Sequence, residues 1–569
     1  MDTRRLVLFV IFSFSIMMLW DGWQRKDAPI QAATEQAAAS AGTGATASAQ
    51  SSANVETGQF KLEQGQRITV STDLYQAEID TVGGDLRHLV LNKHRAKEAK
   101  DGNFVLMDDA AKPMTYLAQT GLIANDLPEG SLPNHKSQFT STTSSVTMPE
   151  GAQTQEVRLS WVNSTNGVSV NKIYTFHRGN YLIEVSYEIN NASANPISPK
   201  VYYQITHDSE SNQGSKMMPT FTGGAYYTDA DKYKKIKFAD MADGNLSKTS
   251  KDGWIGLVQH YFVGAWIPKA GVEREFYTKK LTDKLFAVGL ITPAGNIGAG
   301  SKAVITAKLY AGPQTKEELL AAAPGLEFTV DYGWLTIIAK PLFWLLSKIH
   351  GFVGNWGVAI ILLTVLIKAA FFRLSAASYR SMAQMRELAP RLQSMKEKFG
   401  DDKQKMQQAM MEMYKTEKIN PLSGCLPILM QMPVFIALYW MLSAVVELRH
   451  APFFGWIQDL SAPDTFFGTI PSALPLLGGM PIGLLPLLMG ATMIIQTALN
   501  PAPTDPIQAK VMKIMPVIFS IFFFFFPAGL VLYWLVNNIL SIAQQWYINK
   551  MIHAESIAKK AKLQGSGKR

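Results

Sequence analysis

Long apolar runs dominate the C-terminal part of this chain, and they constrain its fold more than any other feature. They follow one another from about residue 334 onward, and a shorter run covers residues 6–20. In a lipid bilayer the backbone must satisfy its own polar groups, so such runs fold as helices that pack together. The chain between the two apolar regions has the composition of a soluble protein. We therefore predict a multi-domain protein that contains an α-helical polytopic membrane bundle.

The N-terminal run follows two arginines and ends in LWDGW, which lacks the small residues of a cleavage site. We predict an uncleaved signal-anchor transmembrane helix over residues 1–23, with a cytoplasmic N-terminus and the next domain outside. Residues 24–59 are small, polar and nearly free of aromatic side chains. Such a segment buries too little surface to fold, so it predicts a flexible linker.

Residues 60–330 carry the signals of many short strands. YLIEVSYEI (181–189) alternates apolar and polar residues, and NSTNG between VRLSWV and VSVNKIYTF predicts a hairpin. A second hairpin is predicted around Gly83 and Gly84. These patterns favour a large all-β sandwich domain. Its histidines and acidic residues form neither a metal-ligand spacing nor a nucleophile motif, and the single cysteine of the chain, Cys425, excludes an intrachain disulfide.

Residues 331–354 predict an amphipathic interfacial helix, because two lysines and a histidine interrupt the apolar pattern. A five-helix core over residues 355–549 follows, and with the anchor it makes six transmembrane helices. The predicted spans of the core are about 355–373, 422–446, 482–499, 511–526 and 528–546. Residues 550–569 form a basic tail, and the distribution of Lys and Arg places both termini in the cytoplasm. Because the net charge of +9 gathers at the ends of the spans, it argues against DNA binding.

The polar loop at residues 376–420 predicts a cytoplasmic helical hairpin kinked at Pro390. Met382 and Met385 begin an apolar seam on its first arm, and the chain turns at GDD, which contains Asp401 and Asp402. The methionines either pack the seam of the hairpin or form an adaptable binding face.

Lys368 lies inside the first core span, and Thr364 lies one helical turn before it on the same face. Its stem could reach the cytoplasmic headgroups, since Arg373 is roughly 7.5 Å further along a helix. Alternatively it faces a wet interior, together with Asn537 and Gln431 of two other spans. The amides also fit a role as hydrogen-bonded contacts between helices. The spans contain no proton-relay carboxylate and no cofactor motif, so we predict no enzymatic activity, no cofactor and no metal.

Three stretches resemble the bacterial YidC family of membrane protein insertases. They are GNWGVAIILLTVLIKAAFF, GDDKQKMQQAMMEMYKTEKINPLSGCLPILMQMPVFIALYWML and FPAGLVLYWLVNNILSIAQQ. The resemblance covers essentially the whole chain and is closest to the Gram-negative form, whose periplasmic domain is a β-supersandwich. It implies a non-enzymatic insertase and chaperone that inserts, folds and helps assemble integral inner-membrane proteins, alone or with the Sec translocon.

The resemblance also implies a hydrophilic groove within the five core helices. Its positive position falls on Lys368, beside Thr364, and its aromatic position falls on Trp534, beside Tyr533. The commonest family pattern has Arg and Tyr at these two positions; lysine keeps the charge but loses the planar fork of arginine. The implied partners are nascent membrane proteins, the Sec translocon, the phospholipid membrane and the ribosome, which the hairpin and the basic tail would contact.

Two other classes of function stay open from the residues alone. One is a small-solute transporter with a periplasmic receptor domain. The other is an anchored periplasmic protein that binds or modifies sugars, because β-sandwiches of this type bind carbohydrates.

Overall fold

The computed structural model describes residues 62–96, 102–110, 115–209, 214–215, 218–399, 402–416, 426–471, 478–499 and 506–566. The predicted anchor, the predicted linker, Asp401 and Cys425 lie outside these ranges. The chain divides into two compact units, Met1–Glu56 with Ala502–Met515 and Thr57–Pro501 with Pro516–Arg569. The described part of the first unit, residues 506–515, is helical.

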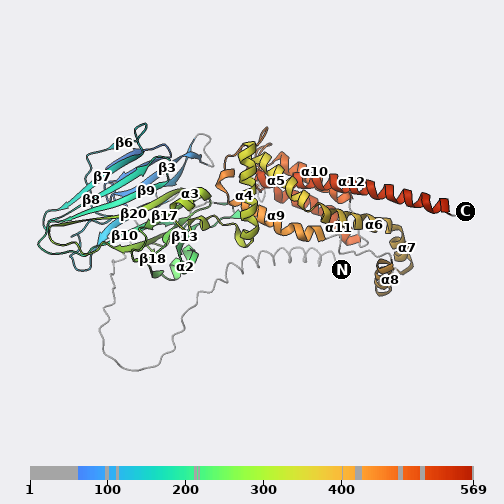
Figure 1. Cartoon of the computed structure of the whole chain (residues 1–569), viewed down its shortest axis with the longest axis horizontal. Helices are drawn as coiled ribbons and strands as arrows, with labels where there is room; N and C mark the ends of the chain where they lie inside the picture. Colours follow the sequence, from blue (N-terminus) through green and yellow to red (C-terminus); the bar gives the residue numbers. More distant parts are fainter. Residues whose placement is uncertain are drawn as a thin grey trace, which may run out of the picture. The chain divides into compact units, whose positions relative to one another are not determined.

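Strands occupy most of the described chain up to residue 313 (Figure 1). Their bounds are β1 (Arg67–Ser71), β2 (Tyr75–Asp80), β3 (Asp85–Arg95), β4 (Asn103–Met107), β5 (Tyr116–Ile123), β6 (Ser145–Thr147), β7 (Thr154–Asn163), β8 (Val168–His177), β9 (Leu182–Asn191), β10 (Lys200–Asp208), β11 (Gly214–Ser215), β12 (Met218–Pro219), β13 (Gly223–Thr228), β14 (Lys232–Ile236), β15 (Ser247–Ser250), β16 (Trp254–Val258), β17 (Phe262–Pro268), β18 (Arg274–Lys280), β19 (Leu285–Pro293) and β20 (Ser301–Pro313). A ten-stranded sheet has the order β15-β18-β19-β10-β5-β3-β2-β1-β6, with β4 beside β3, and an eight-stranded sheet has the order β14-β13-β16-β17-β20-β9-β8-β7.

The two large sheets pack face to face and enclose an aromatic core. The rings of Tyr203 on β10 and Trp266 on β17 lie 5.1 Å apart, and the Trp266 indole N–H donates to the carbonyl of Gln204. The hydroxyls of Thr120 on β5 and Tyr187 on β9 share a further hydrogen bond between the sheets, 2.7 Å long. These contacts confirm the predicted β-sandwich.

Both hairpins expected from the sequence are present. β7 pairs antiparallel with β8 across the NSTNG turn, and β2 pairs with β3 across Gly83 and Gly84, both of which have positive φ. Side chains of β9 alternate as expected, with Ile183, Val185 and Tyr187 fully buried. The alternation of apolar and polar residues therefore determines the register of these strand pairs, because a shift of one residue would expose the buried side chains.

Helices form the C-terminal part of the chain, and two short ones accompany the sheets. Their bounds are α2 (Phe238–Asp243), α3 (Lys316–Ala322), α4 (Thr336–Val353), α5 (Trp356–Ala370), α6 (Phe372–Glu387), α7 (Ala389–Phe399), α8 (Lys403–Thr416), α9 (Leu426–Ala444), α10 (Leu484–Leu499), α11 (Pro506–Phe523) and α12 (Ala528–Ser566), with 3₁₀ turns η1 (Leu326–Thr329), η2 (Gly333–Leu335) and η4 (Val446–Leu448). None of the described helices is long and apolar enough to cross a membrane alone. By length and composition, α5 and the first part of α6, which meet at 66°, pass as a pair.

The helix that begins at Trp356 ends at Ala370, three residues before the predicted end of that span. Neither proline nor glycine lies at the bend. The side-chain amide of Gln544 on α12 donates to the carbonyl of Phe372, the first residue after the bend, at 3.2 Å. Arg373 therefore lies beyond the bend, and the straight-helix path from Lys368 to Arg373 does not exist.

The polar segment after the bend contains three helices, of which α7 packs against α8. α6 ends at Glu387 and α7 begins at Ala389, close to the expected kink at Pro390. Proline lacks the N–H for the i−4 bond and its ring clashes with that carbonyl, which explains the break. α12 continues as one helix to Ser566, so most of the segment predicted as a basic tail is helical (Figure 1).

Gly253, in the turn before β16, is expected to tolerate no side chain. Its φ is +88°, and an added Cβ would lie 1.8 Å from the carbonyl oxygen of Tyr227. Gly253→Ala should therefore destabilise this part of the sandwich by about 3 kcal/mol, measured by hydrogen exchange of the β16 amides in the full chain. Gly271→Ala is the matched control, because Gly271 has a similar φ of +81° but no atom within 4 Å of an added Cβ. Equal effects of the two substitutions would contradict the steric argument.

Candidate functional site

A chain of hydrogen bonds connects polar side chains of three helices in the C-terminal region. The Nζ of Lys368 on α5 donates to the hydroxyl of Ser541 on α12, at 2.7 Å. That hydroxyl donates in turn to the backbone carbonyl of Asn537, also at 2.7 Å. The side-chain oxygen of Asn537 accepts from the amide of Gln431 on α9, again at 2.7 Å. We call Lys368, Ser541, Asn537 and Gln431 the polar chain.

The polar chain depends on helical spacing and on the packing of α12 against its neighbours. Asn537 and Ser541 are four residues apart, so they share one face of α12, and α12 contacts both α5 and α9. The site predicted from the sequence contains Lys368, Asn537 and Gln431, and Ser541, one turn after Asn537, connects Lys368 to Asn537. Within the described ranges, no carboxylate lies at ion-pair distance from Lys368.

Thr364 lies one turn before Lys368, as expected, but its hydroxyl does not take part in the polar chain. It donates to the carbonyl of Ile360 in the same helix, at 2.7 Å, and the residue is only 1% exposed. This bond satisfies the hydroxyl locally, so Thr364 contributes a small buried side chain beside Lys368 and offers no free donor.

Trp534 and Tyr533 belong to an aromatic cluster formed by α9, α11 and α12. The Trp534 ring packs edge-on against Phe435, at 4.5 Å, and against Phe523, at 5.4 Å. Tyr533 stacks on Phe435 at 6.3 Å and is almost fully buried. The indole N–H of Trp534 is buried and has no hydrogen-bond partner among the described residues.

Other polar side chains of α12 bind α10. The amide of Asn538 donates to the hydroxyl of Thr492, at 3.3 Å, and the amide of Gln545 donates to the carbonyl of Leu499, at 3.2 Å. Both α12 residues are 2% exposed. Hydrogen-bonded contacts between helices therefore account for this pair of amides.

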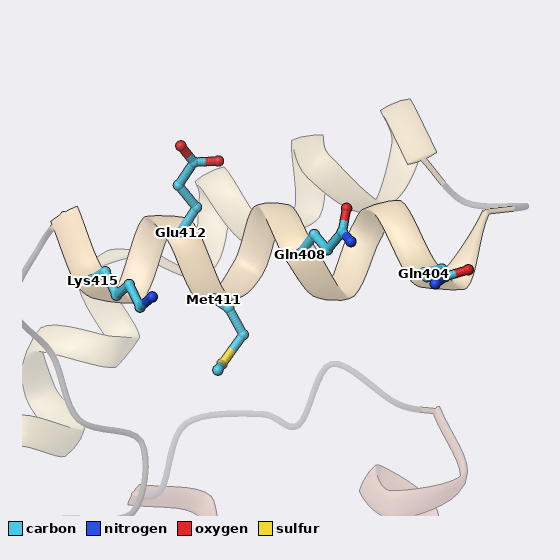
Figure 2. Close-up of a pocket in the computed structure, with 5 residues that line it drawn as sticks. All are labelled: Gln404, Gln408, Met411, Glu412 and Lys415. Carbon is cyan, nitrogen blue, oxygen red and sulfur yellow. The ribbon is translucent and has the colours of Figure 1, made fainter.

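The helices α6 to α8 carry the residues expected in the hairpin. Met382 and Met385 are half-buried on α6, whereas Met413 on α8 is buried. Asp402 caps α8: it accepts from the backbone N–H of Lys405, at 3.1 Å, and this bond lowers the pKa of Asp402. An open hollow runs along α8, and Figure 2 shows Met411 and Glu412 pointing to opposite sides of the helix. The residues that line it are Gln404, Gln408, Met411, Glu412 and Lys415.

Among the residues that the structure describes, no three His, Cys, Asp or Glu side chains lie close enough together to bind a metal ion. The arrangement offers hydrogen-bond donors, hydrogen-bond acceptors and one cation between helices. It can therefore bind polar or acidic groups reversibly.

Comparison with known proteins agrees with this architecture. Residues 67–345 match the family described as YidC periplasmic domain, and residues 348–555 match the family described as 60Kd inner membrane protein. The "Membrane protein insertase YidC" of Methylobacillus flagellatus is 61% identical over 570 residues, which cover 98% of this chain and 99% of that protein. The protein of the same name from Aromatoleum aromaticum is 50% identical over 566 residues, with the same coverage of 98% and 99%. A crystal structure of an active YidC insertase with its first transmembrane domain resolved is 18% identical, has a TM-score of 0.40, and covers 85% of this chain and 93% of that chain.

The two family descriptions identify an inner-membrane protein with a periplasmic domain. On the identity and coverage of these relatives, the chain belongs to the YidC family.

Proposed function

We propose that this protein is a non-enzymatic insertase and chaperone of integral inner-membrane proteins. The observation that carries the proposal is the ammonium group of Lys368, which is held by Ser541 at 2.7 Å and has no carboxylate at ion-pair distance in the described ranges. Such a charge remains available to attract an acidic segment of a client. Full-length relatives named membrane protein insertase support the same function.

The mechanism follows from the cost of moving polar groups through hydrocarbon. An unpaired amide or hydroxyl costs several kcal/mol there, and an isolated charge costs more. Gln431, Asn537 and Lys368 offer alternative hydrogen-bond partners to a crossing segment. Each partner lowers the barrier without making or breaking a covalent bond.

The proposed topology has six transmembrane helices, of which five form the core, and both termini lie in the cytoplasm. In this arrangement the sandwich is periplasmic, α4 lies along the outer leaflet, and α7 and α8 form a cytoplasmic hairpin. The excess of Lys and Arg between α5 and α9 and after residue 549 supports this orientation.

The proposed partners follow from this orientation. Nascent membrane proteins would enter along the polar chain, and the hairpin with the basic C-terminal end of α12 would meet the ribosome or the Sec translocon. The lysines near that end suit ribosomal RNA or anionic lipid equally.

A photocrosslinking amino acid in place of Trp534 is expected to capture a membrane protein arrested during synthesis on the ribosome. Trp534 is preferable to Thr364, which is buried and bonded to its own helix. The control position is Ile494 on α10, which is 53% exposed and is not part of the polar chain. Equal capture at the two positions would contradict the proposed site, and labelling of Trp534 only by small solutes would favour a transporter.

A further inference from the structure

Four exposed aromatic side chains lie close together in the loop between α9 and α10. Phe454 is 63% exposed, Trp456 38%, Phe466 48% and Phe467 57%. The rings of Trp456 and Phe466 meet edge-on at 5.0 Å, and those of Phe466 and Phe467 at 4.8 Å. We call these four residues the aromatic patch. Exposed apolar surface of this kind usually marks an interaction site.

The aromatic patch is held in place by one buried carboxylate. Asp464, which is 5% exposed, accepts the indole N–H of Trp456 at 3.1 Å and the backbone N–H of Phe466 at 3.0 Å. Its other oxygen accepts the backbone N–H of Leu485, in the first turn of α10, at 2.8 Å. The two turns that carry the aromatic side chains are thus fixed to each other and to the start of α10.

The loop also contacts the first residues of two more helices. The carbonyl of Ala462 accepts the N–H of Ala528, where α12 begins. Phe453 packs so closely on Gly357, in the first turn of α5, that a Cβ there would lie 2.1 Å from its ring. Three helices, α5, α10 and α12, therefore begin at this loop, which marks one end of the bundle.

The chemistry of the loop favours lipid over a charged partner. From residue 451 to the start of α10 its sequence contains no Lys or Arg, and the guanidinium group of Arg449, just before, lies over the rings of Phe104 and Phe262. Asp464 is buried, and Asp459 pairs with the Nδ1 of His450 at 3.2 Å. Because the Trp456 N–H is satisfied by Asp464, the indole presents its apolar surface outward. Aromatic side chains at the ends of membrane helices are typical of the bilayer interface.

We propose that the aromatic patch inserts into the outer leaflet of the inner membrane and fixes the depth of the helical bundle, with phospholipid as its partner. The inference rests on the proposed topology, in which the first residues of α5, α10 and α12 face the periplasm. It adds a lipid-binding surface that the insertion of clients does not require. Binding depends on apolar contact, so it is insensitive to salt.

The proposal is tested with a fluorescent probe on the full chain in vesicles of phosphatidylethanolamine and phosphatidylglycerol. Cys425→Ser removes the native thiol, and Phe467→Cys carries an environment-sensitive fluorophore; Val162→Cys, at a position on β7 that is 70% exposed, is the control. Nitroxide on a shallow acyl carbon should quench the probe at residue 467 several-fold more than the control probe, at low and high salt alike. Quenching of both probes by a water-soluble nitroxide to the same extent would overturn the proposal.

A second variant separates lipid contact from a protein that covers the loop. With the probe at Phe454→Cys, the double substitution Phe466→Ser and Phe467→Ser should abolish most of the lipid quenching. Val304→Ser, which removes a side chain that is 66% exposed on β20, should leave it unchanged. A probe shielded from both the lipid nitroxide and the water-soluble nitroxide would mean that protein covers the aromatic patch, and the proposal would be wrong. If the chain with an intact aromatic patch shows the expected lipid quenching but inserts no client membrane protein, the result counts against the proposed insertase function and leaves the lipid contact standing.

Discussion

Replacing Lys368 with methionine is expected to lower the insertion of clients with acidic translocated segments about tenfold, a factor that corresponds to about 1.4 kcal/mol. The substitution keeps the length of the side chain and removes its charge. Two opposite charges about 4 Å apart near a protein surface attract by up to about 4 kcal/mol, and solvent and mobility reduce this value. The measurement is the rate of insertion into proteoliposomes of two clients that differ only in the charge of the translocated segment.

Two further variants show whether charge or packing is responsible. Lys368→Arg keeps the charge and should retain most of the activity, because attraction through space needs no fixed geometry. Ser541→Ala keeps Lys368 but removes the hydroxyl at 2.7 Å, so a smaller loss is expected. The client with a neutral segment should insert equally well in every variant. A methionine variant with full activity on the acidic client would exclude the proposed role of Lys368.

The sandwich could be predicted in some detail because its signals are local. Alternation in YLIEVSYEI and the glycines of two turns specify β9 and the hairpins. The bend after Ala370 could not be predicted, since neither proline nor glycine marks it and the hydrogen bond beside it comes from Gln544, 172 residues further along the chain from Phe372.

The candidate site was predictable as a set of residues but not as a set of contacts. Helical spacing places Asn537 and Ser541 on one face, yet the bond from Lys368 to Ser541 joins residues 173 positions apart. Thr364 shares a face with Lys368, but helical spacing alone does not reveal that its hydroxyl donates to the carbonyl of Ile360 in its own helix.

The sandwich also contains a buried lysine, and the sequence signals its position. Lys172 alternates with Val170 and Tyr174 on β8, so it occupies the inward face, where it is fully buried. A period-2 reading of VSVNKIYTF would have placed it there.

Replacing Lys172 with methionine is expected to destabilise the sandwich by about 3–5 kcal/mol, because it leaves a buried carboxylate without its cation. The Nζ of Lys172 donates to the carbonyl of Gly83, at 3.0 Å, and lies 3.8 Å from Asp85. Together with Tyr174, whose hydroxyl donates to Gly84, it ties the turn between β2 and β3 to the opposite sheet. Hydrogen exchange of the β8 and β9 amides in the full chain measures the loss.

The stability lost in Lys172→Met should depend on pH, and the burial of Asp85 determines the direction of this dependence. Burial raises the pKa of Asp85 from its ordinary value of 3.8 to about 6, against the opposing charge of Lys172. Without Lys172 the folded pKa rises further, so the folded variant binds a proton that the unfolded chain releases. Stability of the variant therefore falls as pH rises, and the deficit relative to the native chain is larger near about pH 7 than near about pH 5.

A control shows whether the destabilisation comes from the buried pair of Lys172 and Asp85 or from the loss of any basic side chain on a strand. Arg158→Met on β7 breaks the exposed pair with Glu188 and should cost no more than about 1 kcal/mol, as exposed ion pairs do. Combining Lys172→Met with Asp85→Asn removes both buried charges and should recover part of the stability, since the carboxylate no longer needs a cation. Two results would show that Lys172 and Asp85 do not act as a buried pair: Lys172→Met destabilises the sandwich no more than Arg158→Met, or its destabilisation is the same at both pH values. In either case the turn at Gly83 is held by its backbone and by Tyr174.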